Sequence, residues 1–233
     1  DALLEGVDRI IPLDYKDWRT KEAKEVRAQV RADGKIPMLM HKAKVVEAAV
    51  MAAKAFIAGS EISGVFDSGK PEQTIVWFEE EHGQTHQILP MPCKARPDWL
   101  TADRALLLHV KTTLGSAQPD SWIRNQLVPM GYDVAAMFYE RGLWASINAN
   151  PPSECALKTL SVFLVIEQTL PHGCSLIGLS PAMQELASAK AERAIRTWAQ
   201  CQASGRWPAY PSRIAYAEPM PWHIAAEEEQ KLF

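Results

Sequence analysis

The chain has few cysteines, and their positions exclude two common kinds of site. Four occur in 233 residues, far apart, and no two form the Cys-x-x-Cys pair that is typical of zinc sites. The spacing also gives no sign of a disulfide framework, so we expect reduced thiols in a cytoplasmic protein. The four are Cys93, Cys155, Cys174 and Cys201.

Long apolar runs and an excess of positive charge are also missing. No stretch of about 18 consecutive apolar residues is present, which argues against a membrane span. The first residues lack the basic, then apolar, then small-residue order of a secretory signal. A formal net charge of −3 argues against a protein that coats nucleic acid by bulk charge, although it is compatible with a local basic groove.

The length and the apolar pattern predict a single mixed α/β domain. A chain of 233 residues is long enough for one sizeable domain and short for two. Residues 1–60 are predicted to be helical, with helices over 18–33 and from Pro37 to about Ala58. Residues 71–204 are predicted to form the α/β core. Residues 205–233, rich in proline and aromatic residues, are expected to wrap the surface as a tail.

Within this core we expect a meander of antiparallel strands, then a helix, two further strands and a last helix. This order predicts a mixed central sheet flanked by helices. The expected strands cover residues 72–78, 85–90, 92–98, 105–112, 159–168 and 174–179, with a turn over 79–83, and the expected helices cover 121–141 and 181–203.

Polar side chains lie at the ends of two predicted strands. Asp98 follows Pro97 at the end of one strand, and Lys111 lies at the polar end of the apolar run that begins at Ala105. Alternation along a strand places His109 and Lys111 on the same face. A carboxylate, a second metal-binding side chain and an ammonium that meet at a strand end can hold a divalent cation and polarise a water for attack on phosphorus.

The wider sequence resembles the PD-(D/E)XK nuclease superfamily, and within it the C-terminal nuclease domain of RecE (exodeoxyribonuclease VIII) and its phage relatives. The core of this resemblance is the string CKARPD at 93–98, followed by LLHVKTT at 107–113. Further matching strings occur in the same order and extend the resemblance over most of the chain. They lie at 71–73 with Trp77, at 131–134 with Phe138 and Tyr139, at 162–165 with Glu167, at 207–210 and at 221–222.

The resemblance implies a restriction-endonuclease-like α/β core that resects linear double-stranded DNA, 5′ to 3′, with magnesium, to make single strands for recombination. It gives Asp98 the role of the first metal carboxylate and Lys111 that of the catalytic lysine. Tyr139 matches the tyrosine of a Gln-x-x-x-Tyr helix motif. The relatives form homo-oligomeric rings on DNA ends and work with a single-strand annealing protein, so the same partners are expected here.

Three positions depart from the family pattern. His109 stands where the family has a second carboxylate, Ala135 stands where the motif glutamine falls, and an N-terminal histidine supplied by many relatives has no counterpart. Magnesium prefers oxygen ligands, whereas imidazole suits manganese better. The resemblance implies Mg²⁺ as the cofactor; if His109 binds the metal, the affinity for Mg²⁺ should fall and Mn²⁺ should be comparatively favoured. Two main functions stay open: an exonuclease weakened by His109, and a DNA-binding or recombination scaffold without catalysis. An endonuclease of the same superfamily that acts on a structured or specific site is a third, more remote alternative.

Several of these residues have both a functional and a structural interpretation. His109 is either a metal ligand or a packed histidine that bonds to Asp98, and Glu72 is either a third acidic ligand or an ordinary glutamate at a strand start. The backbone carbonyl of Val110 completes the expected metal site.

Tyr132 and Tyr139 share one helix face, which suits either core packing or, for Tyr139, a contact at the active site or with DNA. Other side chains are candidates for contacts with the DNA backbone, which position a duplex without reading its sequence. Each basic residue among them, taken alone, is more often solvated surface. These candidates are Thr112, Thr113, Arg96, Lys94 and Arg124.

Overall fold

The chain forms two compact units, residues 1–200 and residues 201–233. None of the described helices combines the length and the hydrophobicity that a membrane-spanning helix requires. Three of the cysteines are free thiols, and Cys155 lies outside the described residues. The computed structural model describes residues 2–4, 6, 8–82, 88–148 and 159–231.

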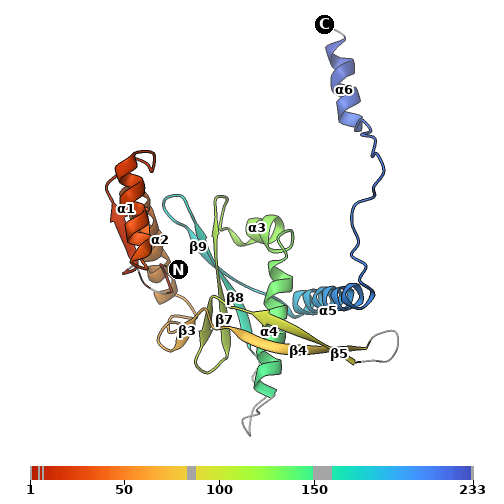
Figure 1. Cartoon of the computed structure of the whole chain (residues 1–233), viewed down its shortest axis with the longest axis horizontal. Coiled ribbons are helices and arrows are strands. Elements are labelled where there is room, and N and C mark those ends of the chain that lie inside the picture. Colours follow the sequence, from red (N-terminus) through yellow and green to blue (C-terminus); the bar gives the residue numbers. More distant parts are fainter. Residues whose placement is uncertain (1, 5, 7, 83–87, 149–158, 232–233) are drawn as a thin grey trace. The chain divides into compact units, whose positions relative to one another are not determined.

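A five-stranded sheet forms the centre of the first unit (Figure 1). The strand order is β3-β6-β7-β8-β9; β7 and β8 run parallel, and the other neighbours run antiparallel. This confirms the predicted mixed sheet. The strands are β3 (Gly69–Pro71), β6 (Trp99–Thr101), β7 (Leu106–Thr113), β8 (Leu160–Glu167) and β9 (Cys174–Gly178).

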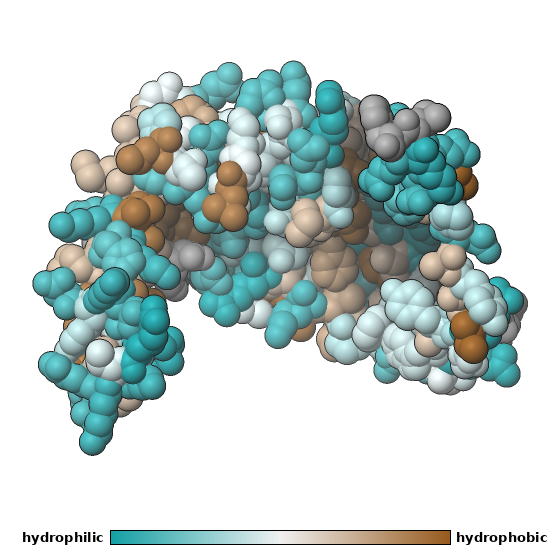
Figure 2. All heavy atoms as spheres, turned by 90° about the horizontal axis from the view of Figure 1, so that it is seen from above, coloured by the Kyte–Doolittle hydropathy of each residue, from teal (hydrophilic) through white to brown (hydrophobic). Residues whose placement is uncertain are grey.

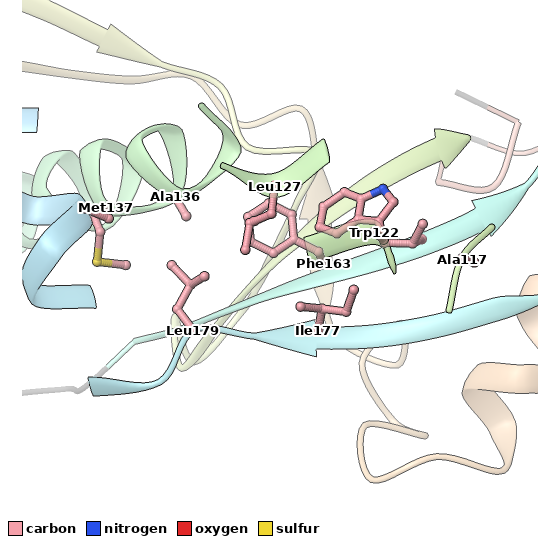
Figure 3. Packing of buried hydrophobic residues seen from close by; sticks show 10 residues of the cluster. Ala117, Trp122, Leu127, Ala136, Met137, Phe163, Ile177 and Leu179 are labelled. Atoms are coloured by element: carbon pink, nitrogen blue, oxygen red, sulfur yellow. The ribbon is translucent and has the colours of Figure 1, made fainter. Parts of the chain in front are cut away.

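Helices cover both faces of this sheet. Alternate residues of β8 point to opposite faces, and since residues of both sets are apolar and buried, each face needs a covering layer. Leu164 packs with Ile57 of α2 on one face. Phe163 packs on the other face with Trp122 and Leu127, which lie next to it in Figure 3. The helices concerned are α2 (Met40–Ala58), α3 (Pro119–Trp122), the π-helical turn η1 (Ile123–Leu127) and α4 (Tyr132–Asn148).

A separate two-stranded ribbon packs on α4. The ring of Trp77 lies 4.8 Å from that of Phe138, between centroids, and fits against the backbone of Gly142. Trp77 Nε1 donates to Glu79 Oε1 at 2.7 Å, and Arg141 donates to both oxygens of this buried carboxylate at 2.6 and 2.7 Å. Burial raises the pKa of Glu79, but the bonds from Arg141 and Trp77 outweigh it and leave that pKa lowered. The strands are β4 (Ile75–His82) and β5 (Ile88–Ala95).

The ribbon corrects two expectations from the sequence. Residues 79–82 extend β4 and do not form the expected turn. The strands expected at 85–90 and 92–98 are a single strand, β5, and residues 83–87 lie outside the described part of the chain. The two prolines of β5 are tolerated because each strand of a two-stranded ribbon has one open edge, where a missing N–H breaks no ladder hydrogen bond.

The N-terminal part is not purely helical. The predicted helix over 18–33 is α1 (Lys21–Ala32). The start predicted for the second helix is wrong, because Pro37 lies in a strand and α2 begins only at Met40. This strand, β2 (Ile36–Leu39), pairs in parallel with β1 (Ile10–Leu13).

The single helix predicted over 121–141 is in fact three segments, α3, η1 and α4. The chain breaks at Gly131, whose φ of +69° is a left-handed conformation that glycine adopts at little cost. Tyr132, the next residue, begins α4. The break therefore sets which residues of α4 face the sheet.

The last helix of the first unit, α5 (Pro181–Ser204), covers the predicted 181–203 and continues into the second unit. The second unit contains a helix that the sequence did not predict, α6 (Pro221–Gln230). At its start the amide of Met220 donates to Nδ1 of His223 at 3.3 Å. The wrapping of residues 205–233 around the domain stays a prediction.

The face of the molecule drawn in Figure 2 is mostly hydrophilic. Figure 2 shows one face, on which hydrophobic residues occur in separate groups among a majority of hydrophilic ones. In the first unit, exposed apolar side chains include Val76 and Phe78 of β4, which alternate with the buried Trp77. This is the pattern expected of a ribbon with one face on the domain and one face in solvent.

Candidate active site at the strand ends

Asp98 and Lys111 meet at the edge where β6 and β7 pair. β5 leads through Pro97 into Asp98, and Trp99 then pairs with Leu108 of β7, which brings Asp98 beside the middle of that strand. Asp98 Oδ2 accepts hydrogen bonds from Val110 N at 2.8 Å and from Lys111 Nζ at 3.2 Å. Both side chains are about a quarter exposed, so this carboxylate–ammonium pair reaches solvent.

His109 lies on the same face of β7 as Lys111, but deeper. It is 3% exposed, its ring stacks on Phe163 at 4.9 Å, and it lies 5.6 Å from the ring of Tyr139, between centroids. Its Nε2 has no hydrogen-bond partner among the described residues. Burial and the charge of Lys111 lower the pKa of His109 to about 4, against an opposing effect of Asp98. The imidazole is therefore neutral at pH 7, with one nitrogen uncommitted.

Two tyrosines of α4 line the same site. Burial raises the pKa of Tyr139, and the negative charges of Asp98 and Glu72 raise it further, so its hydroxyl lies within electrostatic reach of both carboxylates. The ring centroid of Tyr132 lies 5.5 Å from Lys111 Nζ, in the range of a cation–π contact. The sequence put these two residues on one helix face but gave Tyr132 no site role.

Glu72 lies next to Asp98 through the backbone. Its amide donates to the carbonyl of Asp98 at 3.1 Å, directly beyond the pairing of β3 with β6. Its carboxylate forms an ion pair with Arg96 Nε at 2.5 Å. Glu72 and Arg96, predicted as a metal ligand and a DNA contact, therefore bind each other.

The remaining predicted DNA contacts are spread over several elements. Thr112 is exposed and its hydroxyl accepts from Gln168 Nε2 at 3.0 Å, whereas Thr113 is buried and its hydroxyl accepts from Gly115 N at 3.0 Å. The other two, Lys94 on β5 and Arg124 on η1, are exposed.

The donor atoms fit a cation that accepts nitrogen better than they fit magnesium. Asp98 offers a carboxylate and His109 an uncommitted buried nitrogen, while the carboxylate of Glu72 is held by Arg96. Within the described part of the chain, no group of three or more His, Cys, Asp or Glu side chains is placed to hold a metal ion. Magnesium requires an octahedral set made mainly of oxygens, whereas manganese and zinc accept imidazole.

Two solved structures show a limited similarity to this chain. One, described as "Putative exonuclease" from Eubacterium rectale, is 11% identical, with 88% of this chain and 72% of that chain covered and a TM-score of 0.48. The other, described as SSO0001, is 12% identical, with 77% of this chain and 68% of that chain covered and a TM-score of 0.35. No curated protein matches the sequence.

A protein family covers nearly the whole chain. Residues 14–219 match the family described as "PDDEXK-like domain of unknown function (DUF3799)". This confirms the superfamily and the fold that the strings around Asp98 and Lys111 predicted, and divalent metals are generally used by nucleases of this superfamily. The chain belongs to the DUF3799 family of PDDEXK-like domains.

Proposed function

We propose that this protein is a metal-dependent deoxyribonuclease that resects linear double-stranded DNA from an end, in the manner of RecE, with an activity weakened by His109. The observation that carries the proposal is the contact of Asp98 Oδ2, just before β6, with Val110 N and Lys111 Nζ of the neighbouring β7. Resection 5′ to 3′ for recombination, a ring-shaped homo-oligomer and an annealing protein as partner belong to the same proposal.

The residues divide the work between holding a cation and handling the phosphate. Asp98, His109 and the carbonyl of Val110 would hold the cation, which when bound supplies an activated water for attack on phosphorus. Lys111 offsets the negative charge that develops on the phosphoryl oxygens. Its ammonium is oriented for this by Asp98 and by the ring of Tyr132. The hydroxyl of Tyr139, protonated at neutral pH, can donate to a phosphate oxygen.

His109 determines which cation the site prefers. Replacement of an anionic oxygen by a neutral nitrogen removes one charge that would balance a dication. Since magnesium prefers oxygen and manganese accepts imidazole, we expect faster cleavage with Mn²⁺ than with Mg²⁺. The carboxylate of His109→Asp should raise the activity with Mg²⁺.

The test is digestion of linear duplex DNA with each cation by the wild type and by His109→Asp. Changes in the outer shell of a metal site alter affinity or activity roughly 10- to 100-fold, so a ligand change should give at least a tenfold gain with Mg²⁺. His41→Asp is the matched control, because His41 is exposed on α2, and it should leave digestion unchanged. If His109→Asp gains no activity with Mg²⁺, His109 is not the limiting defect.

A second candidate function is a DNA-binding or recombination scaffold of the same fold without catalysis. It is favoured by one observation, that Arg96 holds the carboxylate of Glu72 and a histidine stands at position 109, so few anionic ligands remain beside Asp98 to balance a dication. Such a protein would retain DNA equally with and without divalent cations and would release no products, whereas a nuclease shortens DNA only when a cation is present.

A further inference from the structure

A hollow lies beside the candidate active site, between β5, α4 and α5. Its volume is about 510 Å³. Small residues face each other across it, Ala135 on α4 and Ala191 and Ala194 on α5. Figure 1 shows α5 running past the β4–β5 ribbon and α4. Larger side chains at these three alanine positions would fill part of the space.

The lining is apolar and aromatic, with a single cation. Met91, Phe138 and Ile195 contribute apolar surface. Lys94 is the only charged residue among the described residues that line the hollow, and its side chain is exposed. An anion therefore meets one attractive charge there and no lining carboxylate, while a flat apolar group meets aromatic and aliphatic walls.

Tyr139 connects the hollow with the candidate active site. This residue lines the hollow, and it lies 5.6 Å from His109, between ring centroids. The chain makes the same connection, since Lys94 is followed at once by the segment that leads into Asp98. The hollow and the candidate active site therefore share Tyr139, on which the charge of Asp98 acts.

We propose that this hollow binds the base of an unpaired nucleotide in a DNA strand whose phosphate lies at Asp98 and Lys111, a proposal that rests on the proposed function. Every base has a π face that stacks on aromatic side chains irrespective of sequence. A phosphate next to this base in the same strand would carry the negative charge that Lys94 complements. The volume falls within the range of roughly 300–1,000 Å³ that is usual for small-molecule sites. The substrate is therefore a DNA end with at least one unpaired nucleotide.

The charge favours a nucleotide over an apolar protein segment. A segment of a second copy of the chain would bury the apolar walls equally well, but it would gain nothing from Lys94. A nucleotide uses both the apolar walls and the cation.

The experiment measures DNA binding by the full chain in EDTA, so that no strand is cleaved. The probes are a blunt duplex and the same duplex with an overhang that carries 2-aminopurine, whose fluorescence reports stacking. Ala194→Leu fills the hollow, and Ala189→Leu, the same change at an exposed position of α5 that does not line it, is the control. Lys94→Ala tests the cation without altering the packing, and sedimentation of each variant reports self-association.

We expect Ala194→Leu to weaken binding of the overhang roughly tenfold, as loss of one stacked base does, and to abolish the 2-aminopurine signal. Ala194→Leu should bind the blunt duplex as the wild type does. Ala189→Leu should bind both DNA probes as the wild type does. Lys94→Ala should weaken binding of the overhang. It should also reduce the slope of log K against log salt concentration by about 1, as expected for the loss of one phosphate contact.

Three results would overturn the assignment: Ala194→Leu that binds the overhang as the wild type does, a wild type that prefers the blunt duplex, or an Ala194→Leu effect confined to self-association. Cleavage is assayed separately with Mn²⁺. If the wild type cleaves while Ala194→Leu binds normally, only the base site fails. If overhang binding depends on Ala194 and no cation supports cleavage, only the nuclease proposal fails.

Discussion

Lys190 neutralises a fully buried carboxylate, and its removal tests how strongly this pair stabilises the fold. Asp133, in the first turn of α4, is 0% exposed, and its Oδ2 accepts from Lys190 Nζ at 2.7 Å. Its other oxygen has no hydrogen-bond partner within the described part of the chain. Lys190→Met removes the cation and leaves this charge buried. Loss of one partner of a buried pair costs about 3–5 kcal/mol, and since Lys190 is 24% exposed we expect the lower end.

The assay is thermal unfolding followed by far-ultraviolet circular dichroism. For a chain of this size, about 3 kcal/mol lowers Tm by roughly 6–12 °C. Arg196→Met, at an exposed position of the same helix, should change stability by no more than about 0.5 kcal/mol. The double change Asp133→Leu with Lys190→Met should recover most of the loss, because no charge is then buried. A Tm for Lys190→Met equal to that of Arg196→Met would refute the reasoning.

Two further predictions concern packing and pH. Gly142→Ala puts a methyl group against the buried ring of Trp77, so it should lower the free energy of urea unfolding by about 1–3 kcal/mol. In the control Gly178→Ala the added methyl group meets nothing within 4 Å, so the free energy of unfolding should not change. Equal urea midpoints for the two variants would contradict this account. Since the pKa of His109 falls from 6.5 in the unfolded chain to about 4 in the folded protein, the unfolded chain binds more protons between these values. Stability should therefore fall as the pH drops from 6.5 to about 4, by on the order of 3 kcal/mol, and His109→Gln should remove this dependence. If the stability measured by urea unfolding depends on pH in the same way for the wild type and for His109→Gln, His109 is not buried as a neutral group.

The parts of the site that the sequence could predict depend on local rules. Alternation along β7 puts His109 and Lys111 on one face whatever surrounds the strand. Strands that are consecutive in sequence commonly pair, so Asp98 could be expected beside Lys111. Both expectations needed only a strand of eight residues with a clear apolar pattern.

The parts that the sequence could not predict depend on breaks and on very short elements. Tyr132 reaches Lys111 because the chain breaks at Gly131, which a continuous apolar pattern over 121–141 conceals. Glu72 reaches Arg96 because β3 and β6 pair, and strands of three residues carry too few positions to show a period. A glycine followed by a tyrosine was the available signal for the break.

The most direct test of the central claim is the rate at which the wild type and Lys111→Ala release nucleotides from an end-labelled linear duplex in a single turnover. The account predicts release by the wild type only when a divalent cation is present, and a loss of at least roughly 100-fold in Lys111→Ala, as expected when a group that stabilises transition-state charge is removed. Lys44→Ala, at an exposed position of α2, should cleave as the wild type does. No release by the wild type with any cation, or equal rates for the wild type and Lys111→Ala, would contradict the account.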